Sequence, residues 1–302
     1  MISVVKLLLL ALTAVPLWAS AFTCKILSTG QMVQTGSANL YVNLTPQIGV
    51  GQNLIVDLTQ EIKCKNDSAP PDIDVDHLKL LSGSAYQGAL DNFSGAVYWV
   101  GKYYPIPLTA NTPYYSISNT SYAPLPLKLY LTPLGAAGGK LIRSGELIAV
   151  LSVYKIATFD GGYPTTFTWN IYANNDVVLP TGGCDVSSRD VTVTLPDYPA
   201  SIKVPVNIHC AQSQRLGYSL SGATADAAHT IFSNTASASP ASGVGVQMLR
   251  AGLAVPANQQ VSLGTVGTVP VDLGLTAAYA RTGGQVTAGN VQSIVGVTFV
   301  YQ

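Results

Sequence analysis

The chain ends in Val295-Gly296-Val297-Thr298-Phe299-Val300-Tyr301-Gln302, and this stretch indicates the fold class most clearly. Every second residue from Val295 to Tyr301 is large and either apolar or aromatic. A two-residue period of this kind is typical of a β-strand with one buried face. Two interpretations stay open: an ordinary final core strand, or a strand whose edge also pairs with another protein.

Further segments have the same character along the rest of the chain. They are short, rich in Val, Ile, Leu, Tyr and Thr, and separated by Gly, Pro, Asn or Asp: 39–44, 53–58, 127–131, 167–172, 191–195 and 202–208. No stretch of a dozen residues has clear helical periodicity. Short strands at this spacing predict an all-β chain built of antiparallel sandwiches or barrels.

The composition excludes several classes of protein. Of the 302 residues, 48% are hydrophobic and 10% are charged, with 15 basic residues against 15 acidic ones. A nucleic-acid binder would need a basic surplus to neutralise phosphates, and a disordered chain would lack this much apolar surface. Three histidines leave little material for metal or acid–base chemistry, and no catalytic motif is present. We therefore expect no enzyme, catalytic residue, metal or cofactor.

The first 21 residues have the features of a secretory signal peptide. A short positive start is followed by an apolar run over 7–18 and by the small residues Ala19-Ser20-Ala21, after which a signal peptidase would cut. The mature chain would then begin at Phe22 and be exported.

Export bears on the four cysteines, because an even number of cysteines in a secreted chain indicates disulfide bonds. Three pairings are possible, and the economical one joins Cys24 to Cys64 and Cys184 to Cys210. The Pro-Thr-Gly-Gly stretch at 180–183 is the best boundary. It predicts two β-domains, 22–179 and 184–302, each with one disulfide.

The acidic stretch from Asp72 to Asp76 admits two interpretations. Its alternating carboxylates suit a calcium ion, although an EF-hand starting at Asp72 would need Gly at its sixth position and Glu at its twelfth, where His77 and Gly83 stand. Alternatively, the carboxylates accept hydrogen bonds from sugar hydroxyls. The pairs Tyr103-Tyr104 and Tyr114-Tyr115 are candidates either for stacking on sugars or for packing within a sheet.

Several motifs resemble a known family over the whole mature chain. They include Gly51-Gln52-Asn53-Leu54, Asn92-Phe93-Ser94-Gly95, the stretch from Trp169 to Asp176, 180–193 and nearly all of 279–302. These closely resemble the two-domain tip adhesins of type 1-like bacterial fimbriae, the FimH family. Over 125–155 the sequence is more similar to the galactoside-binding, FmlH-type members than to the mannose-binding ones.

The resemblance implies a role for each domain. The N-terminal one would be a β-barrel-like lectin domain that binds a host glycan. The C-terminal one would be an incomplete immunoglobulin-like pilin domain that lacks one strand. A periplasmic chaperone and then a strand donated by the next subunit would complete it, with an outer-membrane usher assembling the fibre. Val295, Val297, Phe299 and Tyr301 match the pattern that contacts these partners. The chain would be an extracellular protein at the fimbrial tip.

The resemblance also implies a sugar pocket. Phe22, Asn66, Asp67 and Asp76 match pocket positions of the family, and the free α-amine of Phe22 would donate to the sugar. Lys155 and Ala157 stand where mannose-binding members have Gln and Asn, whereas a Lys is present in galactoside-binding members. Tyr163 is a candidate for stacking on a galactose face. The expected ligand is terminal galactose or N-acetylgalactosamine; the alternatives are a mannose-specific adhesin or a structural tip pilin that recognises a host protein.

Overall fold

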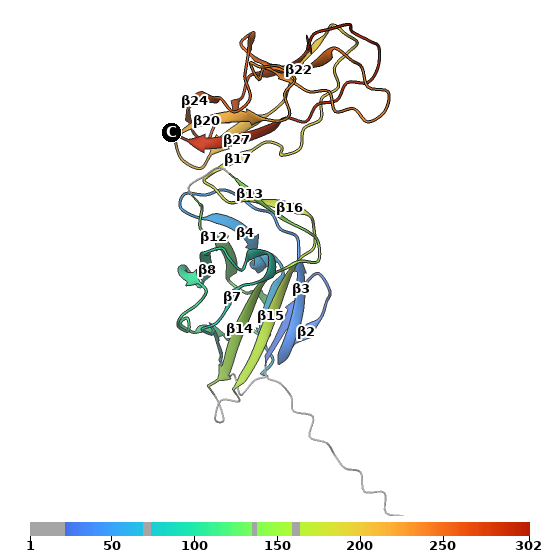
Figure 1. The fold of residues 1–302 in the computed structure, drawn as a ribbon. Coiled ribbons are helices and arrows are strands. Elements are labelled where there is room, and N and C mark those ends of the chain that lie inside the picture. Colours follow the sequence, from blue (N-terminus) through green and yellow to red (C-terminus); the bar gives the residue numbers. More distant parts are fainter. Residues whose placement is uncertain (1–21, 69–73, 135–137, 159–163) are drawn as a thin grey trace, which may run out of the picture.

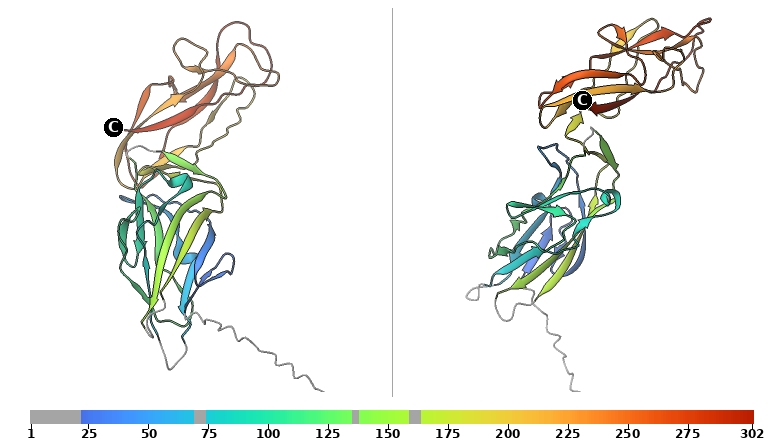
Figure 2. Two further views of the ribbon diagram at one scale, coloured as in Figure 1. Left: turned by 60° about the horizontal axis from the view of Figure 1, so that its bottom comes forward. Right: turned by 60° about the vertical axis from the view of Figure 1, so that its left-hand side comes forward.

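A computed structural model describes residues 22–68, 74–134, 138–158 and 164–302 of the chain. The described residues form β-strands with two short 3-10 helices, Leu58–Gln60 and Gly88–Leu90, so the all-β prediction is confirmed. Two separate hydrophobic cores are present, one running from Phe22 to Leu179 and one from Cys184 to Phe299. They form two bodies placed end to end (Figure 1, Figure 2).

The first core lies between the sheets of the N-terminal body. The strands are β1 (Phe22–Ile26), β2 (Met32–Val33), β3 (Gly36–Val42), β4 (Asn53–Asp57), β5 (Ile62–Asn66), β6 (Asp76–Leu80), β7 (Ala85–Tyr86), β8 (Gly95–Trp99), β9 (Lys102–Ile106), β10 (Tyr115–Ile117), β11 (Ala123–Pro124), β12 (Leu127–Leu131), β13 (Gly139–Ile142), β14 (Leu147–Ala157), β15 (Thr165–Ala173) and β16 (Val177–Pro180). They pair in the orders β11-β5-β1-β2, β10-β6-β14-β15-β3, β4-β12-β8-β9 and β13-β16, and β7 also pairs with β14. The β15–β3 pair is parallel.

The C-terminal body is a smaller set of sheets around the second core. Its strands are β17 (Cys184–Val186), β18 (Ser201–Lys203), β19 (Asn207–Cys210), β20 (Gln214–Ser221), β21 (Ile231–Phe232), β22 (Val244–Arg250), β23 (Leu253–Ala254), β24 (Gln260–Val266), β25 (Val271–Asp272), β26 (Leu275–Arg281) and β27 (Gly296–Tyr301). The sheet orders are β17-β19-β25, β18-β26-β22-β21 and β24-β20-β27, and β23 also pairs with β22.

Two of the strand predictions are wrong. The segment 191–195 forms no strand, although its alternate side chains are half-buried against the second core. Its pattern sets which face is buried, but no neighbouring strand among the described residues supplies hydrogen bonds. The segment 202–208 is divided between β18 and β19 by Val204-Pro205-Val206, because Pro205 has no N–H to donate to a sheet.

The C-terminal strand β27 is an edge strand within the described part of the chain. It pairs with β20 on one side, and the sheet order ends there. Phe299 is buried, while Val295, Val297 and Tyr301 are half-buried against the second core. The strand therefore has the buried face expected of a core strand, and it also has an edge open to a further strand.

Both disulfides of the economical pairing are present. Cys24–Cys64 joins β1 to β5, and Cys184–Cys210 joins β17 to β19. Each bond links directly opposite residues of two antiparallel strands, so each body has one covalent cross-link within a sheet.

The connection between the two bodies is held from both sides. The buried Asn53 side chain donates from Nδ2 to the carbonyl oxygens of Pro180 at 3.0 Å and of Gly182 at 2.7 Å. On the other side, the Gly183 N–H donates to the Tyr301 hydroxyl at 3.2 Å. A cleft of about 320 Å³ lies beside this connection, lined by residues of both bodies including Gly183 and Tyr301.

We expect the Asn53→Ala variant to be less stable than the parent by about 1–3 kcal/mol, because two buried carbonyl oxygens lose their donor. Amide hydrogen exchange over 180–183 should become faster. Chemical denaturation and exchange mass spectrometry measure the two effects. Asn39→Ala, on the exposed face of β3, is the matched control. Equal stability of the parent and Asn53→Ala would show that this side chain does not hold the connection.

Candidate functional site

Four strand ends meet at the end of the N-terminal body that lies away from the C-terminal body (Figure 1). The register pairs the start of β1 with the end of β5, through Phe22 and Asn66. It also pairs the start of β6 with the end of β14, through Asp76 and Ala157. The structure thus brings five of the six predicted pocket residues to one end of the molecule. Tyr163, the sixth, lies outside the described residues.

The centre of this site is a buried ion pair between Asp76 and Lys155. Lys155 Nζ lies 2.8 Å from Asp76 Oδ1, and the two side chains are 6% and 0% exposed. Lys155 lies opposite Leu78 in the sheet, so it is the diagonal neighbour of Asp76 on the inner face. The second carboxylate oxygen, Oδ2, is buried and has no hydrogen-bond partner among the described residues. A buried acceptor without a hydrogen bond lowers the stability of the fold unless a ligand or water donates to it.

Aromatic rings cover the ion pair on one side. The Phe22 ring centroid lies 5.9 Å from Lys155 Nζ, a cation–π distance. Phe22 also packs on Phe167, with ring centroids 6.1 Å apart, and Phe167 in turn contacts Trp169 edge to face. The Phe22 ring thus covers the Lys155 ammonium, and exclusion of water from the buried pair strengthens its electrostatic interaction.

Asn66 and Asp67 form a polar rim beside the buried pair. Asn66 Nδ2 donates to the Asp74 carbonyl oxygen at 2.6 Å, and Asn66 Oδ1 accepts from the Ser68 N–H at 2.6 Å. Asp67 accepts from the Thr23 hydroxyl and lies 2.5 Å from Lys65 Nζ. The Asn66 contacts fix the chain as it leaves β5, while the Asp67 carboxylate is partly exposed to solvent.

The acidic stretch does not gather into a metal site within the described residues. No group of three His, Cys, Asp or Glu side chains there is placed to hold a metal ion, and Asp72 lies outside that part of the chain. Asp74 Oδ1 instead accepts hydrogen bonds from the Thr158 backbone N–H at 2.9 Å and from the Thr158 hydroxyl at 2.8 Å. This contact ties the start of β6 to the end of β14.

Sequence reasoning missed two residues that shape the site. Phe167 supports Phe22, and Thr158 holds Asp74. Phe167 alternates with Trp169 in a strand, which is a signal for an inward-facing side chain. The contact between Thr158 and Asp74 spans 84 residues of sequence and carries no such local signal.

Burial of the Asp76 carboxyl raises its pKa above the usual value of 3.8, although the Lys155 ammonium acts in the opposite direction. The folded state therefore keeps the Asp76 proton to a higher pH than the unfolded chain does. The stability contributed by this group is fully present below pH 3.8 and is lost as the pH rises through the raised folded-state pKa.

The test compares the parent with Asp76→Asn by urea denaturation from about pH 3 to 6. The difference in free energy of unfolding, parent minus variant, should fall as the pH rises, because only the parent titrates at this position. A difference that rises with pH would mean that the carboxylate is stabilised rather than penalised in the fold.

Among the described residues, no helix is long and apolar enough to cross a membrane.

Comparisons with known proteins identify the family of the chain. The family described as "FimH, mannose binding" matches residues 24–170. The chain is 58% identical over 285 residues to the type 1 fimbrin D-mannose specific adhesin of Escherichia coli K12, covering 94% of each chain. It is 39% identical over 293 residues to the S-fimbrial protein subunit SfaH of Escherichia coli O6:K15:H31, covering 93% of this chain and 97% of the other.

A solved structure is also similar: the chaperone–tip adhesion subunit complex of the Csu pili of Acinetobacter baumannii. It has 12% identity and a TM-score of 0.30, covering 91% of this chain and 99% of that one. The assignment of the chain to a family rests on the two sequence matches that span nearly its full length. An adhesin of this kind acts by binding and not by catalysis, which agrees with the expectation that the chain is not an enzyme. The chain belongs to the FimH family of two-domain fimbrial tip adhesins, which are exported through the periplasm to the pilus tip.

Proposed function

We propose that residues 22–179 form a lectin domain that binds the terminal hexose of a host glycan at Asp76, and so attaches bacteria to cells. The observation that carries this proposal is the buried Asp76 Oδ2, which has no hydrogen-bond partner among the described residues. A sugar hydroxyl is a neutral donor that satisfies such an acceptor, and a charge-assisted hydrogen bond to a carboxylate is strong. Phe22, Asn66, Asp67 and Lys155 surround it as further pocket residues.

D-mannose is the first candidate for the hexose. The 58% identical relative is named for D-mannose specificity, and the matched family is described as mannose-binding. These relationships support mannose better than the galactose or N-acetylgalactosamine expected from Lys155 and Ala157. A terminal galactoside is the second candidate, because a buried ammonium at Lys155 stands where mannose-binding members have a neutral amide.

A glycan array tests the proposal with the full mature chain, co-expressed with a periplasmic chaperone and beginning at Phe22. We expect binding to terminal mannosides and loss of that binding in Asp76→Ala. The matched control is Asp91→Ala, an exposed carboxylate outside the site. Binding to galactosides alone would support the second candidate. A folded chain that binds no glycan would contradict the lectin proposal and favour recognition of a host protein.

For residues 184–302 we propose an incomplete pilin domain. The half-buried Val191, Val193 and Leu195 have no strand beside them, and β27 has an open edge within the described residues. A strand with alternating apolar side chains would supply both the missing backbone hydrogen bonds and the missing cover for the core. A periplasmic chaperone would provide it first, and the next fimbrial subunit would replace the chaperone at an outer-membrane usher.

A further inference from the structure

The outer face of the sheet next to the Asp76 site carries a distinct cluster of side chains. Along β6, Asp76 and Leu78 face the core, so His77 and Lys79 face outward. The register places His77 opposite both Ser116 of β10 and Ile156 of β14, and it places Lys79 opposite Tyr154. His77 is therefore the chain neighbour of Asp76, and Tyr154 is the chain neighbour of Lys155.

Lys79 lies between two tyrosine rings. Its Nζ is 4.7 Å from the Tyr114 ring centroid and 5.0 Å from the Tyr154 ring centroid, both within cation–π range. The His77 ring meets Tyr114 edge to face at 6.0 Å, and His77 Nδ1 lies 2.8 Å from Ser116 Oγ. Tyr114 is 46% exposed. We call His77, Lys79, Tyr114, Ser116 and Tyr154 the Lys79 cluster.

The charge of this cluster is not neutralised by a carboxylate in the described part of the chain. Lys65, Lys128 and Lys155 each form an ion pair with an aspartate, whereas Lys79 makes no such pair there. The tyrosine and serine hydroxyls and the imidazole add hydrogen-bonding groups around the ammonium. An anionic group with several acceptor oxygens matches this combination of charge and hydrogen bonding.

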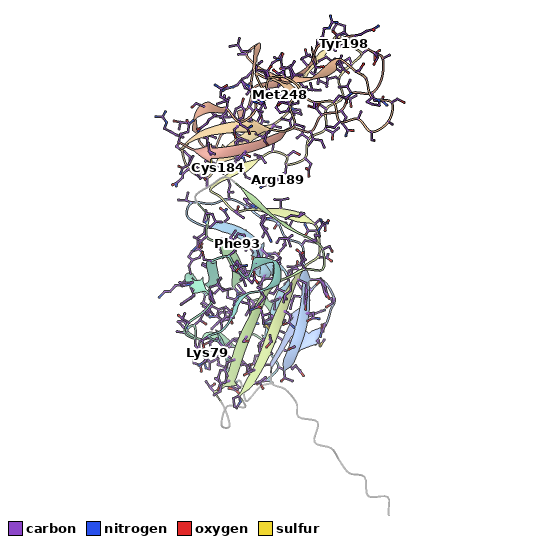
Figure 3. All side chains as sticks on the ribbon, in the orientation of Figure 1. Lys79, Phe93, Cys184, Arg189, Tyr198 and Met248 are labelled. Carbon is purple, nitrogen blue, oxygen red and sulfur yellow. A yellow bond between two sulfur atoms is a disulfide. The ribbon has the colours of Figure 1, made fainter. Side chains whose placement is uncertain are left out.

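The position of the cluster indicates which kind of ligand would carry the anionic group. Figure 3 places Lys79 near the same end of the molecule as the Asp76 site. Asp74 and Thr158 contact each other at the rim of the same sheet, where β6 begins and β14 ends. A glycan that leaves the pocket across this rim has its later sugar residues over the cluster.

We propose that the Lys79 cluster binds the carboxylate of an acidic sugar in the same glycan whose terminal hexose occupies the Asp76 site. This inference rests on the proposed lectin function. The Lys79 ammonium binds the carboxylate, and the Tyr114 and Tyr154 hydroxyls are the candidate donors to it.

The contribution is modest and depends on salt. A partly exposed ion pair of this kind improves affinity by about two- to fivefold, which corresponds to the range for exposed pairs. Raising the ionic strength screens the pair, because the Debye length is about 10 Å at 0.1 M salt and becomes shorter as more salt is added. Contacts in the buried Asp76 site are screened much less.

The experiment uses the full mature chain co-purified with its chaperone, bound by biolayer interferometry to two branched glycans. Both present, on one branch, the terminal hexose that the glycan array identifies; on the other branch one carries a sialic acid and the other a neutral hexose. At about 50 mM NaCl the acidic glycan should bind two- to fivefold more tightly, and the advantage should shrink at about 300 mM NaCl.

Lys79→Gln should remove this advantage and leave affinity for the neutral glycan unchanged. The matched control is Lys102→Gln, which removes an exposed lysine from the separate β4-β12-β8-β9 sheet and should keep the advantage. Equal binding of the two glycans by the parent would overturn the inference while leaving the lectin proposal standing. An advantage that survives in Lys79→Gln would also overturn it. Failure of both glycans to bind would overturn the lectin proposal and this inference together.

Discussion

Replacing Lys155 with methionine should lower the free energy of unfolding by about 3–5 kcal/mol, the range seen when one partner of a buried ion pair is removed. The Asp76 carboxylate would then be fully buried without its cation, since its side chain is 0% exposed and Lys155 Nζ is its neighbour at 2.8 Å. The loss should be smaller at low pH, because protonation of Asp76 removes the uncompensated charge. Urea denaturation at about pH 4 and pH 7 measures both effects.

The double variant Asp76→Leu with Lys155→Met provides the control. It removes both charges together, and a well-packed apolar pair often restores or exceeds the stability of a buried ion pair. The double variant should therefore be more stable than Lys155→Met alone, yet it should bind no glycan. If Lys155→Met cost less than about 1 kcal/mol, the pair would behave as a surface ion pair and the site would not be a buried one.

The second large effect concerns the open edge of the C-terminal body. A synthetic peptide with alternating apolar residues should stabilise the mature chain by about 4 kcal/mol when supplied at a thousand times its dissociation constant. It would pair with β27 and cover Val191, Val193 and Leu195, which are only half-buried. Thermal unfolding of the chain with and without the peptide gives the shift in Tm.

Two comparisons make this result specific. A peptide with its apolar residues moved by one position places them on the wrong face and should stabilise far less. Val193→Asp should abolish the effect of the original peptide, whereas Leu253→Asp, at a 74% exposed position away from β27, should not. Equal stabilisation by both peptides would contradict pairing of a strand at this edge.

Much of the fold could be predicted from local patterns. The alternation over 127–131 gave the bounds of β12, and the economical cysteine pairing gave both disulfides. A two-residue period fixes which side chains are buried, but it does not say which strand, if any, lies alongside. The segment 191–195 illustrates this, because its alternate side chains are half-buried although the predicted strand does not form.

The site was predictable in part, and mainly through resemblance. A further sequence signal was available for Lys155, because it occupies the same face of β14 as Leu151, Val153 and Ala157 and so must be buried. A buried lysine requires a partner, but the sequence does not name Asp76, which lies 79 residues earlier in the chain. The sheet register supplies that pairing, and registers between distant strands follow from the whole fold.

The central claim is that a hexose binds at Asp76. Its most direct test is a crystal structure of the mature chain with its chaperone, soaked with methyl α-D-mannoside. The account predicts sugar density at the end of the N-terminal body, with a hydroxyl within hydrogen-bond distance of Asp76 Oδ2. Density for the sugar elsewhere on the molecule, with Asp76 untouched, would contradict it.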